Sequence, residues 1–219
     1  MNSGNTIDKS KYLSLEEGRY LVKLARKTVE YRLENKVFPP VDPSSLTPRL
    51  KEDRGVFTTI YKFVNGRKEL RGCIGYPLPI KPLYKAVMET AIESAFNDPR
   101  FPPIKAEEMD LVIFEVSVLT PLEKIEYKSP LELPKLVKVG RDGLVLKYGP
   151  YSGLLLPQVP VEYNWDAEEY LIHLSMKAGL PPDGYLYKGV EIYRFEAQIF
   201  SEKSPKGEVV EEKLASCDV

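Results

Sequence analysis

An Asn-Gly pair between two strand-forming segments is the feature of this sequence that most restricts how the chain can fold. Residues 56–64 are rich in β-branched and aromatic side chains, the pair Asn65-Gly66 follows, and a second such segment spans residues 67–75. A two-residue type I′ turn needs a positive φ angle at both central positions, and Asn-Gly meets that need best. The sequence therefore predicts a tight β-hairpin.

The two-residue turn also predicts the register of the hairpin. Counting outward from the turn, Ile60 faces Arg71 and Thr58 faces Cys73. Side chains alternate between the two faces of a strand, so Arg71 and Cys73 are expected on one polar face. The other face is expected to be apolar and to carry Phe57, Tyr61, Phe63, Leu70 and Ile74.

Patterns on both sides of the hairpin predict an α+β protein with an antiparallel sheet packed against helices. Ser14 and Glu17 have the spacing of a capping box and open a long amphipathic helix. The remaining periodic segments are a helix from Pro82 to about Asn97, a strand over 111–119, short strands over 137–159, a helix over 166–178 and a last strand over 191–200. Residues 203–219 are charged and are expected to form a mobile tail.

Composition narrows the environment and the partners. With 31 basic and 32 acidic residues the chain has no net field to attract phosphate backbones, so a nucleic-acid partner is not expected. The N-terminus is polar, and no run approaches the ~18 apolar residues of a membrane span, so the protein is expected to be neither exported nor embedded. Cys73 and Cys217 are the two cysteines, a usage that suits the reducing cytoplasm. The 19 prolines favour a thermophilic source.

The segment from Leu70 to Gly75 carries the candidate chemistry. A guanidinium beside a thiol favours the thiolate, so Cys73 is the candidate nucleophile and Arg71 the candidate anchor for an anionic group. Glycine at 72 and 75 indicates a bulge or a close backbone approach, and both are candidate ligand-binding positions. In the alternative interpretation Cys73 is a small buried hydrophobe and Arg71 pairs with an acid such as Glu69.

Two further candidates and several exclusions complete this picture. Glu115 lies on the polar side of its predicted strand and is a candidate acid/base partner, which a buried ion pair would explain equally well. His173 is the only histidine, so no zinc site of the Cys/His type is expected, and a Cys73–His173 dyad would require the two residues to meet in space. Motifs for nucleotides, hydrolases and metalloproteases are absent, and neither a metal nor a cofactor is expected.

The six residues from Leu70 to Gly75 resemble the signature of the AMMECR family. Further segments resemble that family in the same order: Ala95 with 98–103, then 115–121, 153–159, Trp165 and 177–180. The similarity covers about residues 12 to 202, which are expected to form one domain of two lobes. Tyr76 departs from the pattern, because many members have threonine after the signature.

The resemblance implies an α+β fold with a larger lobe, built on an antiparallel sheet, and a smaller, mostly β lobe. It implies no established activity. The leading hypothesis is an enzyme or ligand-binding protein in which the signature strand lines a cleft, with Cys73 and Glu115 as catalytic residues and Arg71, Gly72, Gly75 and Arg100 binding a small anionic ligand. The alternative is a non-catalytic adaptor that binds a protein or RNA partner. Either form is expected to be a monomer or a homodimer.

Overall fold

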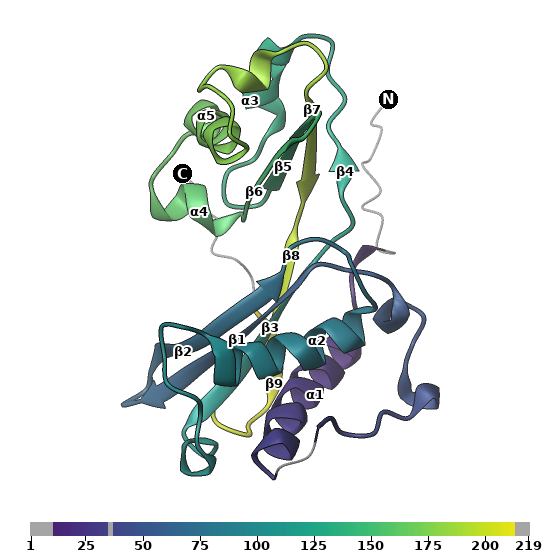
Figure 1. Cartoon of the computed structure of the whole chain (residues 1–219), viewed down its shortest axis with the longest axis vertical. Coiled ribbons are helices and arrows are strands. Elements are labelled where there is room, and N and C mark those ends of the chain that lie inside the picture. Colours follow the sequence, from purple (N-terminus) through teal and green to yellow (C-terminus); the bar gives the residue numbers. More distant parts are fainter. Residues whose placement is uncertain (1–10, 35–36, 213–219) are drawn as a thin grey trace, which may run out of the picture. The chain divides into compact units, whose positions relative to one another are not determined.

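The computed structural model describes residues 11–34 and 37–212, which fold into two compact units (Figure 1). The first unit comprises the described residues up to Thr120 together with Gln198–Glu212, and the second comprises Pro121–Ala197. Each unit has its own antiparallel sheet and its own helices. The α+β class expected from the sequence is confirmed.

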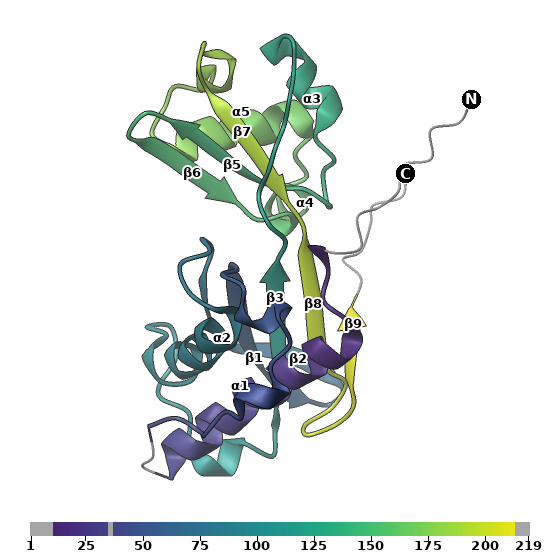
Figure 2. The same cartoon turned by 90° about the vertical axis from the view of Figure 1, so that its right-hand side faces the viewer.

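The first unit is built on a five-stranded sheet in the order β2-β1-β3-β8-β9. Its strands are β1 (Val56–Val64), β2 (Arg67–Tyr76), β3 (Val112–Leu119), β8 (Ala197–Glu202) and β9 (Val209–Glu212). The predicted hairpin is confirmed, since Asn65 has φ 51° and Gly66 has φ 76°, as a type I′ turn requires. Strand β2 lies at one edge of the sheet, and Figure 2 shows β8 and β9 running side by side toward the other.

Two helices cover one face of this sheet, α1 (Leu15–Leu33) and α2 (Leu83–Ile92), which continues into a π-helical turn (Glu93–Asn97) (Figure 1). Apolar side chains of the helices pack against alternate residues of the strands and form a single hydrophobic core. The apolar residues at helical spacing in α1 and α2 predict this packing. Its members include Leu21, Val22, Val87, Ile60, Phe114 and Phe200.

A buried ion pair fastens α1 to the sheet. Arg26 of α1 donates to both carboxylate oxygens of Glu202, at 2.7 and 2.6 Å, and to the carbonyls of Met109 and Val112. The guanidinium also lies over the Phe114 ring, 4.7 Å from its centroid. All three guanidinium nitrogens of this buried arginine thus donate to strand and loop acceptors, which offsets the cost of burying the charge.

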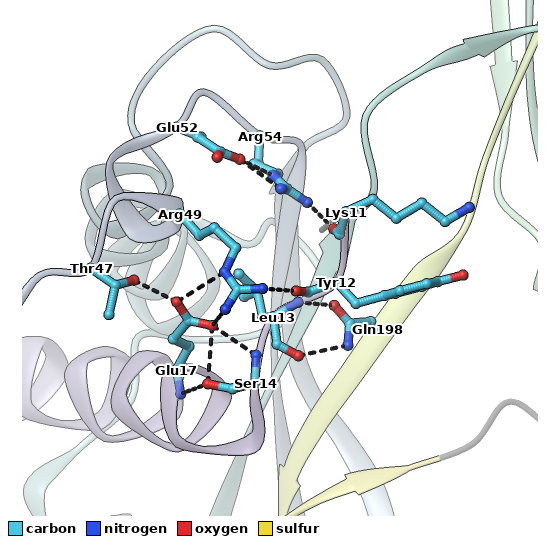
Figure 3. A network of polar contacts seen from close by, with 10 residues as sticks. All are labelled: Lys11, Tyr12, Leu13, Ser14, Glu17, Thr47, Arg49, Glu52, Arg54 and Gln198. Carbon is cyan, nitrogen blue, oxygen red and sulfur yellow. Dashed lines mark hydrogen bonds and ion pairs between the residues drawn. The ribbon is translucent and has the colours of Figure 1, made fainter. Parts of the chain in front are cut away.

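The start of α1 is held by a network of polar contacts drawn in Figure 3. The Glu17 carboxylate accepts from the backbone N–H of Ser14 and from Thr47, and it pairs with Arg49, which donates to the carbonyl of Tyr12. The predicted capping box is therefore confirmed, with two added partners from the loop after α1. On the other side Gln198 bonds both backbone groups of Leu13.

The second unit has a four-stranded sheet in the order β4-β7-β5-β6. Its strands are β4 (Glu123–Lys124), β5 (Gly143–Tyr148), β6 (Tyr151–Leu155) and β7 (Glu191–Phe195), and its helices are α3 (Leu133–Leu136), α4 (Gln158–Glu162) and α5 (Ala167–Lys177). Helix α5 starts at the predicted cap, Asp166, and packs Leu171 and Leu174 against Leu144 and Ile192.

The structure differs from the sequence-based expectations near the C-terminus. The last strand, expected over 191–200, is two strands that belong to different sheets, since β7 ends at Phe195 and β8 begins at Ala197. Residues 209–212 lie in the expected tail but form β9, because β8 offers a free edge and Val209 contributes to the core. Residues 213–219, including Cys217, lie outside the described residues.

No helix within residues 11–34 and 37–212 is both long and apolar enough to cross a membrane.

Candidate functional site

A β-bulge in the hairpin decides which side chains of β2 share a face. The strands pair as the two-residue turn requires as far as Tyr61 and Leu70, but the next pair is Ile60 with Gly72. Arg71 is therefore an extra residue, and the predicted pairings of Ile60 with Arg71 and of Thr58 with Cys73 are wrong. One inserted residue shifts every later side chain to the opposite face.

Beyond the bulge, three side chains stand in a row across neighbouring strands. Cys73 of β2 is directly opposite Thr59 of β1, and Thr59 is directly opposite Glu115 of β3. Directly opposed residues of antiparallel strands project to the same face. Within the described part of the first unit, α1 and α2 cover the other face, where Val56 and Ile60 enter the core. We call the face with Cys73, Thr59 and Glu115 the helix-free face.

Cys73 is held firmly at a partly exposed position. The Thr59 hydroxyl donates to its sulfur at 3.4 Å, and among the described residues it is a free cysteine. Its backbone N–H donates to Oδ2 of Asp98 at 2.9 Å, and its carbonyl accepts from Nη2 of Arg100 at 3.2 Å. Side chains thus satisfy the outer edge of β2 here, in place of another strand.

Glu115 lies in a cluster of polar side chains contributed by the other strands of the helix-free face. Tyr61 donates to its carboxylate at 3.5 Å, and Nζ of Lys68 lies 3.7 Å from it. The same ammonium group bonds Ser201 of β8 at 3.2 Å and Glu212 of β9 at 2.6 Å. All five strands therefore contribute to one polar cluster, in which Glu115 and Ser201 are themselves buried.

Burial dominates the electrostatics of this cluster. It raises the pKa of the Glu115 carboxyl, and although Lys68 acts in the opposite direction, the nearby Glu212 adds to the rise. Burial and the adjacent Glu115 likewise raise the pKa of the Tyr61 phenol, which stays protonated. A carboxyl group with a raised pKa next to a neutral phenol is suited to giving and accepting protons.

The arginines singled out in the sequence are both engaged with carboxylates. Arg71 makes a two-pronged contact with Glu108, at 2.9 and 3.1 Å, and is buried with its guanidinium near Phe101. Arg100 pairs with Asp98 through Nε and Nη2. These hydrogen bonds hold the pKa of Asp98 far below its usual range, although its burial acts the other way. Arg71 thus pairs with an acid, as the alternative interpretation expects, but that acid is Glu108 and not Glu69.

The two glycines of the signature segment are explained by neighbouring groups of the chain itself. A β-carbon at Gly72 would lie 2.1 Å from the carbonyl oxygen of Ser94, and one at Gly75 would lie 2.2 Å from the Phe57 ring. The expectation of a bulge or a close backbone approach is confirmed for Gly72, which follows the bulge at Arg71 and lies against the Ser94 carbonyl.

The remaining candidates lie elsewhere. His173 belongs to the second unit, where its ring stacks on Trp165 with centroids 3.8 Å apart. In the segments 11–34 and 37–212, no group of three or more His, Cys, Asp or Glu side chains is placed to hold a metal ion. Sequence reasoning missed Thr59, Tyr61, Lys68, Ser201 and Glu212, which become neighbours only through the strand order.

Comparison with known proteins gives consistent matches over nearly the whole chain. The sequence model of the AMMECR1 family matches residues 22–200. Protein MJ0810 of Methanocaldococcus jannaschii is 54% identical over 202 residues, which cover 92% of this chain and 98% of that protein. Protein PYRAB00100 of Pyrococcus abyssi is 53% identical over 201 residues, with 91% and 97% covered. Both relatives come from thermophilic archaea, the source that the proline content favours.

A solved structure is similar over the same extent. The crystal structure of the uncharacterized protein PH0010 from Pyrococcus horikoshii has a TM-score of 0.73 and 50% sequence identity, and the match covers 91% of this chain and 98% of that one.

Proposed function

The chain belongs to the AMMECR1 family, and on that premise we propose that it binds a small ligand on the helix-free face, with Cys73 as the reactive thiol and Glu115 as the proton-transfer partner. The observation that carries this proposal is the row of Cys73, Thr59 and Glu115 across three strands. A thiol and a carboxyl group on the same face of the sheet support this proposal.

The spacing of the row suits a ligand between its two ends. Cys73 and Glu115 are separated by the strand that carries Thr59, so their backbones are two strand spacings apart, about 10 Å. That distance is too long for direct proton transfer. Thr59 and Glu115 are only 6% and 7% exposed, so a ligand that bridges the two ends must displace the groups that cover them now. The Thr59 hydroxyl, already directed at the sulfur, stabilises negative charge that develops there.

The charges of the surface favour a neutral ligand group at this position over an anionic one. Arg71 and Arg100, the anchors inferred from the sequence, are neutralised by Glu108 and Asp98. Lys68 is shared between Glu115 and Glu212. In this proposal the two arginines position the edge strand. The ligand is a small cytoplasmic molecule with an electrophilic centre that the thiol can attack.

Alkylation of the folded protein tests the reactivity of the thiol. In a Cys217→Ser background, where Cys73 is the single thiol, iodoacetamide is added at increasing sub-denaturing concentrations of guanidinium chloride, and the adduct is followed by intact mass. A partly exposed nucleophile reacts at a rate that does not depend on the denaturant. An alkylation rate that rises with denaturant in proportion to unfolding would show that Cys73 is a packed core residue and would favour the adaptor interpretation.

Two threonine variants make the test specific to the row. Thr59→Val removes the donor to the sulfur and is expected to slow alkylation of the folded protein. Thr58→Val is the matched control, because the Thr58 hydroxyl bonds Thr90 at 2.8 Å on the helix-covered face. Equal rates in the two variants would remove Thr59 from the proposal.

A further inference from the structure

A hollow on the helix-covered side of the first unit lies between α2 and the segment that follows α1. It has a volume of about 260 Å³. Its apolar walls are formed by Phe38, Pro39, Val41, Tyr84 and Met88. The consecutive prolines 39 and 40 have fixed φ angles and stiffen the segment, so this wall is set by the sequence. We call this hollow the α2 pocket.

Two charged side chains of α2, Lys85 and Glu89, complete the lining of the pocket. They differ in whether another side chain pairs with their charge. The Glu89 carboxylate accepts from the Tyr76 hydroxyl at 3.1 Å and pairs with Lys81. Lys85 is exposed and has no hydrogen bond or ion pair within residues 11–34 and 37–212, and its ammonium group lies 5.9 Å from the centroid of the Tyr84 ring. The pocket therefore has apolar walls and one uncompensated positive charge at its edge.

We propose that the α2 pocket binds a small carboxylic acid with an aromatic or branched apolar body, the body filling the hollow and the carboxylate pairing with Lys85. The chemistry follows from the charge, because a carboxylate can form a charge-assisted hydrogen bond with the ammonium group that lies beside the apolar walls. The size follows from the volume. A dry cavity of about 150 Å³ accommodates benzene, so about 260 Å³ accommodates a ring with a short carboxylate arm.

Binding of 3-phenylpropanoate to the full-length protein tests this inference. Met88 lines the pocket, so ¹³C-methyl labelling of methionine places a reporter inside it, and its signal is assigned from a Met88→Leu variant. The acid is expected to shift the Met88 signal saturably, with the weak affinity usual for a ligand of this size. The neutral isostere 3-phenylpropanamide is expected to bind about tenfold more weakly, because it lacks the charge-assisted contact.

Two lysine variants assign the charge to its source. Lys85→Met keeps the apolar stem and removes the ammonium group, and it is expected to abolish the preference for the acid over the amide. Lys27→Met is the matched control, since Lys27 is an exposed helical lysine 5.6 Å from the centroid of Tyr31 and does not line the pocket. No shift of the Met88 signal, equal binding of acid and amide, or a preference that survives in Lys85→Met would each overturn the inference.

Discussion

The carbonyl oxygen of Ser94 approaches Gly72 so closely that a β-carbon at Gly72 would lie 2.1 Å from it. Ser94 belongs to the π-helical turn after α2, and its hydroxyl accepts from the N–H of Ile74 at 2.8 Å and donates to the carbonyl of Thr58 at 2.7 Å. One residue of the turn thus contacts both strands of the hairpin. The position of Cys73, between Gly72 and Ile74, depends on this contact.

Gly72→Ala is therefore expected to lower the free energy of unfolding by about 1–3 kcal/mol, because the methyl group meets backbone that cannot move aside without shifting the turn. Guanidinium denaturation measures the change. Gly207→Ala is the comparison, since its β-carbon would first meet the hydroxyl of the exposed Ser204, which can rotate away. Equal losses in the two variants would contradict the role given to Ser94.

The hairpin shows what the sequence could and could not predict. The turn Asn65-Gly66 is a local signal, and the strands pair from it as expected as far as Leu70. The bulge at Arg71 depends on partners distant in sequence, because Glu108 receives its guanidinium and Ser94 fills the space beside Gly72. No periodicity within the strand encodes those partners. The predicted pairings of Arg71 with Ile60 and of Cys73 with Thr58 are wrong for that reason.

The raised pKa of Glu115 predicts how stability depends on pH. Burial disfavours the ionised carboxylate, so the native protein holds this proton to a higher pH than the unfolded chain does. Between the two pKa values the native state binds more protons, and stability falls as pH rises. Glu115→Gln removes this loss, so the variant is expected to gain stability relative to the parent as the pH is raised through and above the ordinary range of glutamate, about pH 4 to 5.

Urea denaturation at a series of pH values measures that difference. Glu123→Gln is a suitable control, because its side chain is substantially exposed and pairs with Arg194 in the second unit. A difference between Glu115→Gln and the parent that stays constant with pH would show that Glu115 titrates alike in the folded and unfolded chains.

Asp98 predicts the opposite dependence. Hydrogen bonds from Arg100 hold its pKa well below the usual range, even against its burial, and the N–H of Cys73 adds to them. The stabilisation is complete above the unfolded pKa and is lost as pH falls toward the folded one. Asp98→Asn is expected to cost about 2–3 kcal/mol near neutral pH, with a gap to the parent that narrows below about pH 4.

Denaturation at neutral and acidic pH measures both parts of this expectation. Asp110→Asn serves as control, because Asp110 pairs with Lys206 at an exposed position, where little change is expected. A gap for Asp98→Asn that widens in acid would refute the assignment.

The polar cluster of the helix-free face could not be predicted from the sequence, because its members meet only through the order of the strands in the sheet. Glu115 was found from strand alternation, but Lys68 and Glu212 are 144 positions apart and meet only because β9 joins the sheet beside β8. The charged composition after residue 202 indicated a tail, and composition does not reveal that β8 has a free edge to pair with. Strand order is a property of the whole sheet.

The single tryptophan and the single histidine provide a readout confined to the second unit. Trp165 and His173 stack with ring planes 4° apart, and Tyr163, 66% exposed, stacks on Trp165 with centroids 5.0 Å apart. The imidazole ring of His173 covers one face of the indole. His173→Ala removes that ring and is expected to move the tryptophan emission maximum to longer wavelength, because the exposed indole face becomes hydrated. His173→Phe restores a flat ring in the stack and is expected to keep the emission maximum of the parent protein. An emission maximum that is the same in His173→Ala and in the parent would show that the two rings do not stack in solution.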